Sequence, residues 1–162
     1  MKNVLLFGMI LLTLSSCLKR EQYPNRPDLE YLSYSLGFDT VPSANPIGMV
    51  NFRFTDGDGD LGLNQADTFG VHAVGAPYYY NLFVRYFEKK NGVFEEIIAP
   101  GSFNVRFVDL TPEGADKTLE GEMEVGVFDS GSEFDTVRYE MYIVDRALQH
   151  SDTISTPIII RP

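Results

Sequence analysis

Residues 49–63 read Met49-Val-Asn-Phe-Arg-Phe-Thr-Asp-Gly-Asp-Gly-Asp-Leu-Gly-Leu63 and join two different patterns. From Val50 to Phe54 every second residue is apolar and the residues between are polar. This two-residue period is typical of a strand that buries one face. The glycine-rich acidic half that follows therefore begins where a strand ends.

The acidic loop, residues 56–60, places Asp56, Asp58 and Asp60 at alternate positions with a glycine between each pair. Alternate side chains of an extended chain point the same way, and glycine lets the backbone curl through positive φ. Three carboxylates directed at one point repel each other unless a hard cation lies between them. Oxygen-only ligands favour Ca²⁺, so the loop predicts a calcium site. The alternative is a pair of tight Asp-Gly turns on an acidic surface.

The spacing of these aspartates partly resembles the calcium loop of EF-hands. That resemblance implies an acid at position 12, which here is Asp67. The chain departs from the pattern, because Leu61 stands where the family has its turn glycine and Gly62 comes one residue later. The flanking segment also reads as strand and not helix, so a calcium site between strand and loop fits better than an EF-hand.

Outside the acidic loop, alternating apolar residues and turn signals predict strands along most of the chain. The Asn91-Gly92 pair between two such segments predicts a hairpin, and Pro157 predicts an edge strand. No segment after the N-terminal run has the 3.6-residue period of a helix. The predicted strands are residues 29–36, 47–55, 79–89, 93–98, 102–108, 118–128, 136–144 and 153–160.

Seven or eight short strands without helices predict an all-β fold, a two-sheet antiparallel sandwich over residues 29–162, with an up-and-down barrel as the alternative. The order and lengths resemble the immunoglobulin and fibronectin type III class, a likeness of architecture that transfers no function. That resemblance implies that the loop after 47–55 and the turn after 136–144 lie at the same end. We therefore expect Asp145 to join Asp56, Asp58 and Asp60 around the ion.

The N-terminus reads as a processing signal over residues 1–16. Lys2 is followed by an apolar run from Val4 to Leu14, which is too short to span a bilayer. The following Leu14-Ser15-Ser16-Cys17 resembles the bacterial lipobox. It implies cleavage before Cys17, the only cysteine of the chain, and acylation of its thiol. An ordinary secretory signal followed by a chance cysteine is the alternative.

Residues 17–28 are polar, contain two prolines and read as a lipidated tether to the folded part. The lipobox predicts anchoring in the outer membrane, with the membrane face left open. The chain has 13 basic and 23 acidic residues, and loss of Lys2 with the signal changes the net charge from −10 to −11. Such a charge argues against binding nucleic acid, and it leaves membrane attachment to the lipid.

The chain has few residues of the types that form zinc sites or catalytic triads in other proteins. His72 and His150 lack the partners of a zinc site, and His150-Ser151-Asp152 cannot form a hydrolase triad from adjacent residues. Tyr78–Tyr80 offers a stacking platform, although the chain has no tryptophan. We expect a non-enzymatic accessory subunit with an outer-membrane protein partner. The alternative is a glycan-binding or glycan-processing accessory lipoprotein.

Overall fold

The computed structural model describes residues 22–38, 46–98, 103–127 and 133–161. The predicted signal segment and Cys17 lie outside these residues. Within them the chain is all-β, with a single 3₁₀ turn, η1 (Gly70–His72), and no α-helix. The described part also contains no helix of the length and hydrophobicity needed to cross a bilayer.

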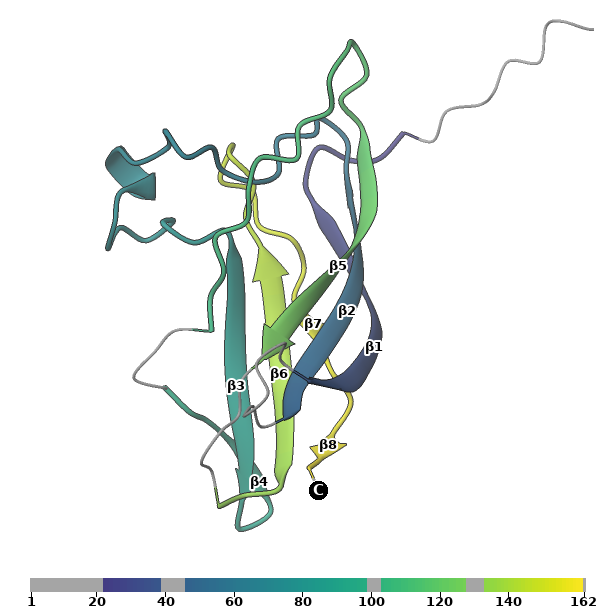
Figure 1. Ribbon diagram of the computed structural model, residues 1–162, viewed down its shortest axis with the longest axis vertical. Coiled ribbons are helices and arrows are strands. Elements are labelled where there is room, and N and C mark those ends of the chain that lie inside the picture. Colours follow the sequence, from purple (N-terminus) through teal and green to yellow (C-terminus); the bar gives the residue numbers. More distant parts are fainter. Residues whose placement is uncertain (1–21, 39–45, 99–102, 128–132, 162) are drawn as a thin grey trace, which may run out of the picture.

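Two antiparallel sheets face each other (Figure 1). One has the order β1-β2-β5, and the other has the order β4-β3-β6-β7, with β8 also paired to β6. This confirms the predicted two-sheet sandwich over the barrel alternative. The strand bounds are β1 Asp28–Phe38, β2 Pro46–Asp56, β3 Leu82–Lys90, β4 Val93–Glu96, β5 Leu119–Val127, β6 Thr136–Ile143, β7 Ile154–Ser155 and β8 Ile159–Ile160.

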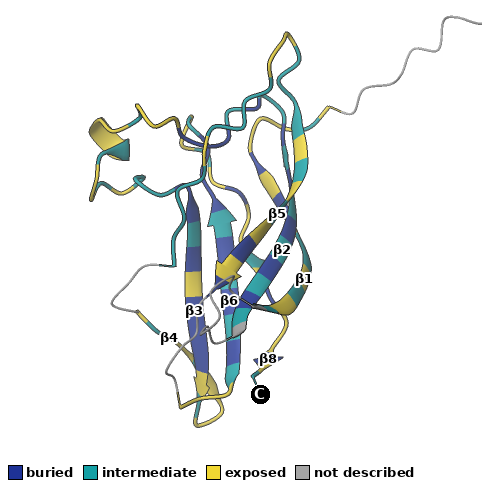
Figure 2. Cartoon of the chain, viewed as in Figure 1, coloured by how far each residue is buried: buried dark blue, intermediate teal, exposed yellow. Residues whose placement is uncertain are grey.

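The core lies between the sheets, where each long strand contributes every second side chain (Figure 2). On β2, Val50 and Phe52 are fully buried, as the opening pattern predicts. Tyr86 of β3 stacks on Tyr139 of β6 with ring centroids 5.2 Å apart. Each fully buried side chain of this size stabilises the fold by about 1.5–3 kcal/mol.

The prediction of a strand over residues 102–108 is wrong. The described part of this segment makes only isolated bridges, an antiparallel one from Val105 to Leu82 and a parallel one from Val108 to Leu63. Its apolar side chains still pack against the core, which is why the alternation is present.

Two asparagines explain why this segment lacks a ladder. The Asn81 amide donates to the carbonyl of Phe107 at 2.9 Å and accepts from its N–H at 2.8 Å. Asn104 Oδ1 accepts the N–H of Val84 at 2.9 Å. Side-chain amides thus satisfy backbone groups that a neighbouring strand would otherwise satisfy.

The predicted last strand, residues 153–160, is divided in two. Pro157 lies between β7 and β8, and both short strands pair with β6 at the edge of the five-stranded sheet. Between them Thr156 bonds Tyr139, donating its N–H to the carbonyl at 2.9 Å and accepting through its hydroxyl at 3.1 Å. The predicted strand 79–89 likewise begins only at Leu82, because the preceding tyrosines belong to a turn.

Residues 22–27, predicted as part of the tether, pack against the sandwich. Arg26 donates to the carbonyl of His150 at 2.6 Å and to the carboxylate of Asp152 at 2.5 Å. Pro27 is fully buried. The folded part therefore begins before the predicted boundary at residue 29.

Candidate metal centre

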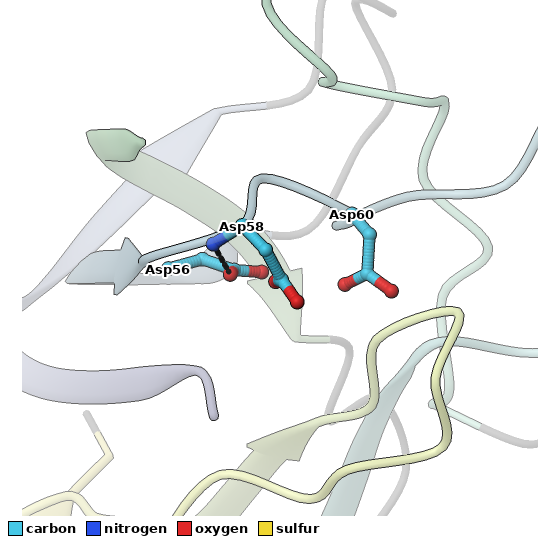
Figure 3. Close-up of side chains that lie close together, drawn as sticks. All are labelled: Asp56, Asp58 and Asp60. Atoms are coloured by element: carbon cyan, nitrogen blue, oxygen red, sulfur yellow. Dashed lines mark hydrogen bonds between the residues drawn. The ribbon is translucent and has the colours of Figure 1, made fainter. Parts of the chain in front are cut away.

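The acidic loop follows directly from β2, whose last residue is Asp56. Figure 3 shows the carboxylates of Asp56, Asp58 and Asp60 directed into one space. Each offers an oxygen within 4.8 Å of an oxygen of the others. Within the described ranges, this is the only group of three or more carboxylate, histidine or cysteine side chains so close together.

The loop is curled by its own first side chain. Asp56 Oδ1 accepts the N–H groups of Asp58 and Gly59, both at 3.2 Å, as aspartate does in tight turns (Figure 3). Gly59 takes a φ of +65°, which turns the chain so that Asp60 faces back toward Asp56.

Asp145 lies beside this loop. The Asp60 carbonyl accepts the N–H of Arg146 at 3.2 Å, and Asp60 Oδ2 accepts the N–H of Ala147 at 2.9 Å. Asp145 Oδ1 accepts the N–H of Gln149 at 2.7 Å. The turn after β6 is thus bonded directly to the loop after β2, although Asp145 stays outside the 4.8 Å group.

Four carboxylate oxygens at this place are buried and have no hydrogen-bond partner among the residues that the structure describes. Asp56 is fully buried and Asp145 is 2% exposed. A buried charged oxygen without a partner is costly, and native proteins pair nearly all such atoms. The oxygens are Oδ2 of Asp56 and Asp145 and Oδ1 of Asp58 and Asp60.

The environment opposes ionisation of Asp56 and Asp145. Burial raises the pKa of Asp56 to about 7, and the neighbouring carboxylates of Asp58 and Asp60 add to the rise. Burial also raises the pKa of Asp145 to about 6, with the charges of Asp60 and Asp58 adding to it. A divalent cation would reverse this, since it favours the ionised carboxylates that would bind it.

Asp109 is the contrasting carboxylate nearby. Burial opposes its ionisation, but hydrogen bonds from Thr111 and Arg146 outweigh it and lower its pKa well below the ordinary range. Arg146 bonds Asp109 at 2.6 Å and the carbonyl of Gly62 at 3.1 Å. Arg146, which follows Asp145 directly in the chain, therefore forms its ion pair with a different acid, Asp109.

Asp67 is not brought to the loop. Its Oδ2 accepts the N–H of Asn64 at 2.7 Å and closes a separate turn. The ligand implied by the EF-hand spacing is therefore placed elsewhere, because the chain leaves the loop at Leu61 and does not return after eleven residues as a helix-flanked loop would.

Glycines let three other segments approach the acidic loop. A Cβ on Gly57 would lie 2.2 Å from the carbonyl oxygen of Tyr23, and one on Gly59 would lie 1.8 Å from that of Lys117. At Gly62, where φ is +90°, it would lie 2.0 Å from the carbonyl oxygen of Val108. The sequence shows the spacing of these glycines, but it does not show which segments of the chain approach them.

We call this end of the sandwich the metal pole: the acidic loop 56–60, residues 22–27, residues 107–118 and the turn 145–149. The Gly57 N–H donates to the carbonyl of Pro24 at 2.8 Å, which ties the first of these segments to the loop. An ion held by the four aspartates would be enclosed by protein, an arrangement typical of a structural ion.

Comparisons of the chain with protein-family models, with curated proteins and with solved structures found no match. The fold and the site therefore rest on the geometry of this chain alone.

Proposed function

We propose that this protein is an envelope lipoprotein, held in the outer membrane by acylated Cys17, whose sandwich binds a structural calcium ion. In this proposal the domain works as a non-catalytic accessory subunit of an outer-membrane protein complex. The observation that supports the calcium site best is the set of four buried, unpartnered aspartate oxygens at the metal pole.

Calcium suits these ligands better than a transition metal, because all four are carboxylate oxygens and no histidine or cysteine of the described part of the chain joins them. Calcium also tolerates irregular coordination from loops, whereas magnesium demands a near-octahedral arrangement. The bound ion would offset the repulsion among four negative charges on a chain of net charge −10.

The position of the site suggests its purpose. The acidic loop contacts the N-terminal segment through Pro24, and that segment leads back to Cys17. By fixing the acidic loop, calcium would fix the point where the domain leaves its lipid anchor. A defined orientation at the membrane is what an accessory subunit needs to meet its partner.

The anchor is tested by Cys17→Ser. We expect this change to abolish labelling by a fatty-acid analogue and to release the protein from the membrane fraction, because one acylated cysteine supplies the attachment. The measurement is sedimentation after a salt wash. A protein that still sediments with membranes is held by something other than the lipid.

The accessory role is tested by affinity capture from detergent-solubilised native membranes. We expect one outer-membrane protein to be enriched with the wild type. A matched control with Asp58→Asn should capture less of it in the same calcium buffer, because the pole would be less ordered. Equal capture by both proteins would mean that the surface that binds the partner does not depend on the calcium site.

A second candidate function, glycan binding, is favoured by a row of rings on the outer face of the five-stranded sheet. Phe83 and Tyr142 are parallel with centroids 4.9 Å apart, and His150 continues the row 5.5 Å from Tyr142. A hollow of about 280 Å³ beside the row is lined in part by Arg85 and Glu96. This candidate is tested on a glycan array, where the wild type should bind a glycan and Phe83→Ala should bind it less. Absence of binding by the wild type would reject the candidate.

A further inference from the structure

An uncharged loop projects from the sandwich between β2 and β3. We call residues 68–80 the apolar loop; in Figure 1 it includes η1 and extends to the upper left. Phe69 is 83% exposed, Val74 is 80% exposed and Val71 is 43% exposed. Neighbouring large apolar side chains so far in solvent are unusual and mark an interaction surface.

Charge is also absent from this part of the chain. Between Asp67 and Arg85 there is no aspartate, glutamate, lysine or arginine, although these four residue types make up 22% of the chain. The other loop at this end, residues 112–117, carries Glu113 and Asp116. Of the loops at this end of the sandwich, the apolar loop is therefore the one that enters an apolar environment at the lowest cost in free energy.

The apolar loop is held in shape from its base. Arg106 donates to the carbonyls of Asn64 and Asp67 at 2.9 Å, where the chain enters, and to that of Tyr79 at 2.8 Å, where it leaves. Within the loop the Tyr78 N–H donates to the Val71 carbonyl at 3.0 Å. The exposed side chains are thus displayed on an ordered backbone, which reduces the entropy lost on binding.

The N-terminal segment leaves the sandwich at the same end as the apolar loop (Figure 1). Gln22, the first residue the structure describes, is five residues from Cys17. Five extended residues span at most about 18 Å. A lipid on Cys17 would therefore keep the metal pole close to the bilayer surface.

We propose that the apolar loop rests on this lipid surface and inserts Phe69, Val71 and Val74 among the headgroups. The inference depends on the proposed anchor at Cys17. It favours lipid over a protein partner because the short connection brings the bilayer to this end and the loop has no charge to pair with a protein surface. The lipid supplies the attachment, and the loop would fix how the domain sits on the bilayer surface.

The test uses the absence of tryptophan from the chain. Phe69→Trp introduces a single indole at the loop, and residues 17–162 are coupled through the sole thiol, Cys17, to a maleimide lipid in phosphatidylcholine vesicles. Coupling replaces acylation, so failure of the proposed anchor in cells and failure of the loop contact are separate results. We expect the indole emission to shift to shorter wavelength and to be quenched by brominated acyl chains.

The matched control is Val93→Trp, since Val93 is 64% exposed in the β3–β4 hairpin at the opposite end. Its emission should not change when the protein is coupled. Adding Val74→Asp to Phe69→Trp should abolish the quenching while the circular dichroism stays the same, because a carboxylate resists entry into the bilayer.

Three results would overturn the inference. One is an unquenched indole at position 69 in the coupled vesicles. Another is a shift that occurs only in native outer-membrane vesicles, which would make the occupant a membrane protein. The third is equal quenching at positions 69 and 93, since it would reflect the tether and not the loop.

Discussion

Two acidic stretches of this chain share one spacing and differ in almost everything else. Asp56-Gly-Asp-Gly-Asp60 and Glu120-Gly-Glu-Met-Glu124 each carry three carboxylates at alternate positions. The glutamates lie along β5, where all three side chains are exposed. The aspartates follow β2 into a curled loop, where each leaves one buried oxygen without a partner.

The difference shows that spacing supplies the carboxylates while backbone curvature decides what they can bind. An extended strand keeps its alternate side chains parallel and in water, where repulsion is screened and an arginine such as Arg53 meets Glu122 at 3.6 Å. Positive φ at Gly59 instead turns the next carboxylate inward. Only the second arrangement concentrates charge out of reach of water.

The largest effect is expected from the glycine that makes the curvature. Gly59→Ala should destabilise the domain by about 2–4 kcal/mol, because the added Cβ would meet the Lys117 carbonyl oxygen 1.8 Å away in a backbone with φ of +65°. The measurement is urea unfolding followed by circular dichroism.

Gly126→Ala in β5 is the control for this change. Its Cβ would meet the Ile47 side chain at an ordinary 3.5 Å. We expect its stability to stay within about 0.5 kcal/mol of the wild type. If both variants unfold alike, the close approach at the acidic loop is not what fixes its shape.

The second largest effect is expected from calcium, which should stabilise the domain through the acidic loop and not through the glutamates of β5. An extracellular-type site with a dissociation constant of about 10⁻⁴–10⁻³ M, at ten times that concentration of calcium, adds about 1.4 kcal/mol. That corresponds to a rise of about 3–6 °C in melting temperature. Asp58→Asn should remove most of the rise, and Asp145→Ala should remove part of it. In chelator Asp58→Asn should melt no lower than the wild type, because it also removes repulsion from Asp56.

The control for calcium is the middle acid of the other stretch, changed in Glu122→Gln. This variant should show the full rise, as should Asp116→Ala in residues 112–117. A wild-type melting temperature that is the same in chelator and in calcium would remove the calcium site from the proposed function. Loss of the rise in Asp58→Asn but not in Asp145→Ala would mean that the acidic loop binds the ion alone.

The pH dependence of the calcium-free protein should be the reverse of the usual behaviour of carboxylates. The pKa is raised from 3.8 to about 7 at Asp56 and to about 6 at Asp145. A raised folded-state pKa gives stability that is present below about pH 4 and is lost as the pH rises to about 7. Calcium-free protein should therefore melt higher at about pH 5 than at about pH 8, and added calcium should raise stability most at the higher pH.

Melting in calcium-free buffers across this range checks the prediction, with Asp56→Asn as the variant that should flatten the curve. A calcium-free wild type that gains stability as the pH rises would mean that the aspartates are paired by groups of the protein itself.

The smallest effect is expected on β5. Glu122→Ala should change the melting temperature by less than about 2 °C, because its ion pair with Arg53 is long, at 3.6 Å, and both side chains are largely exposed. A large loss would mean that β5 uses its acids structurally, and the contrast with the acidic loop would fail.

The sequence predicts the fold well where burial decides it and less well where side chains replace the backbone ladder. Val50 to Phe54 alternate because one face packs on the core, so β2 was predictable. The segment 103–108 alternates for the same reason, but the Asn81 side chain bonds both backbone groups of Phe107, and Asn104 of the segment uses its side chain to accept the N–H of Val84. The strand propensity of a segment does not show that a side-chain amide elsewhere in the chain, such as that of Asn81, will bond its backbone.

At the site, sequence predicted the three aspartates of the loop, because they are contiguous, and Asp145, because the sandwich brings two turns to one end. It misplaced Asp67, whose assignment rested on a helix-flanked loop that this fold lacks. It also missed the contacts at Gly57, Gly59 and Gly62, since each glycine accommodates a segment far away in sequence. Such contacts form only when distant segments meet at the metal pole, so the sequence around each glycine does not predict them.

The contacts of Arg26 have a consequence for the order in which the chain folds. Its partner Asp152 is 126 residues away, and the Gln149 amide reaches the carbonyl of Asn25 at 3.5 Å across 124 residues. Closing so long a loop slows folding and cannot begin until nearly the whole chain has been released. A chain still emerging from the ribosome or from a translocation channel therefore keeps this end open, and the first residues to leave are among the last to reach their native places.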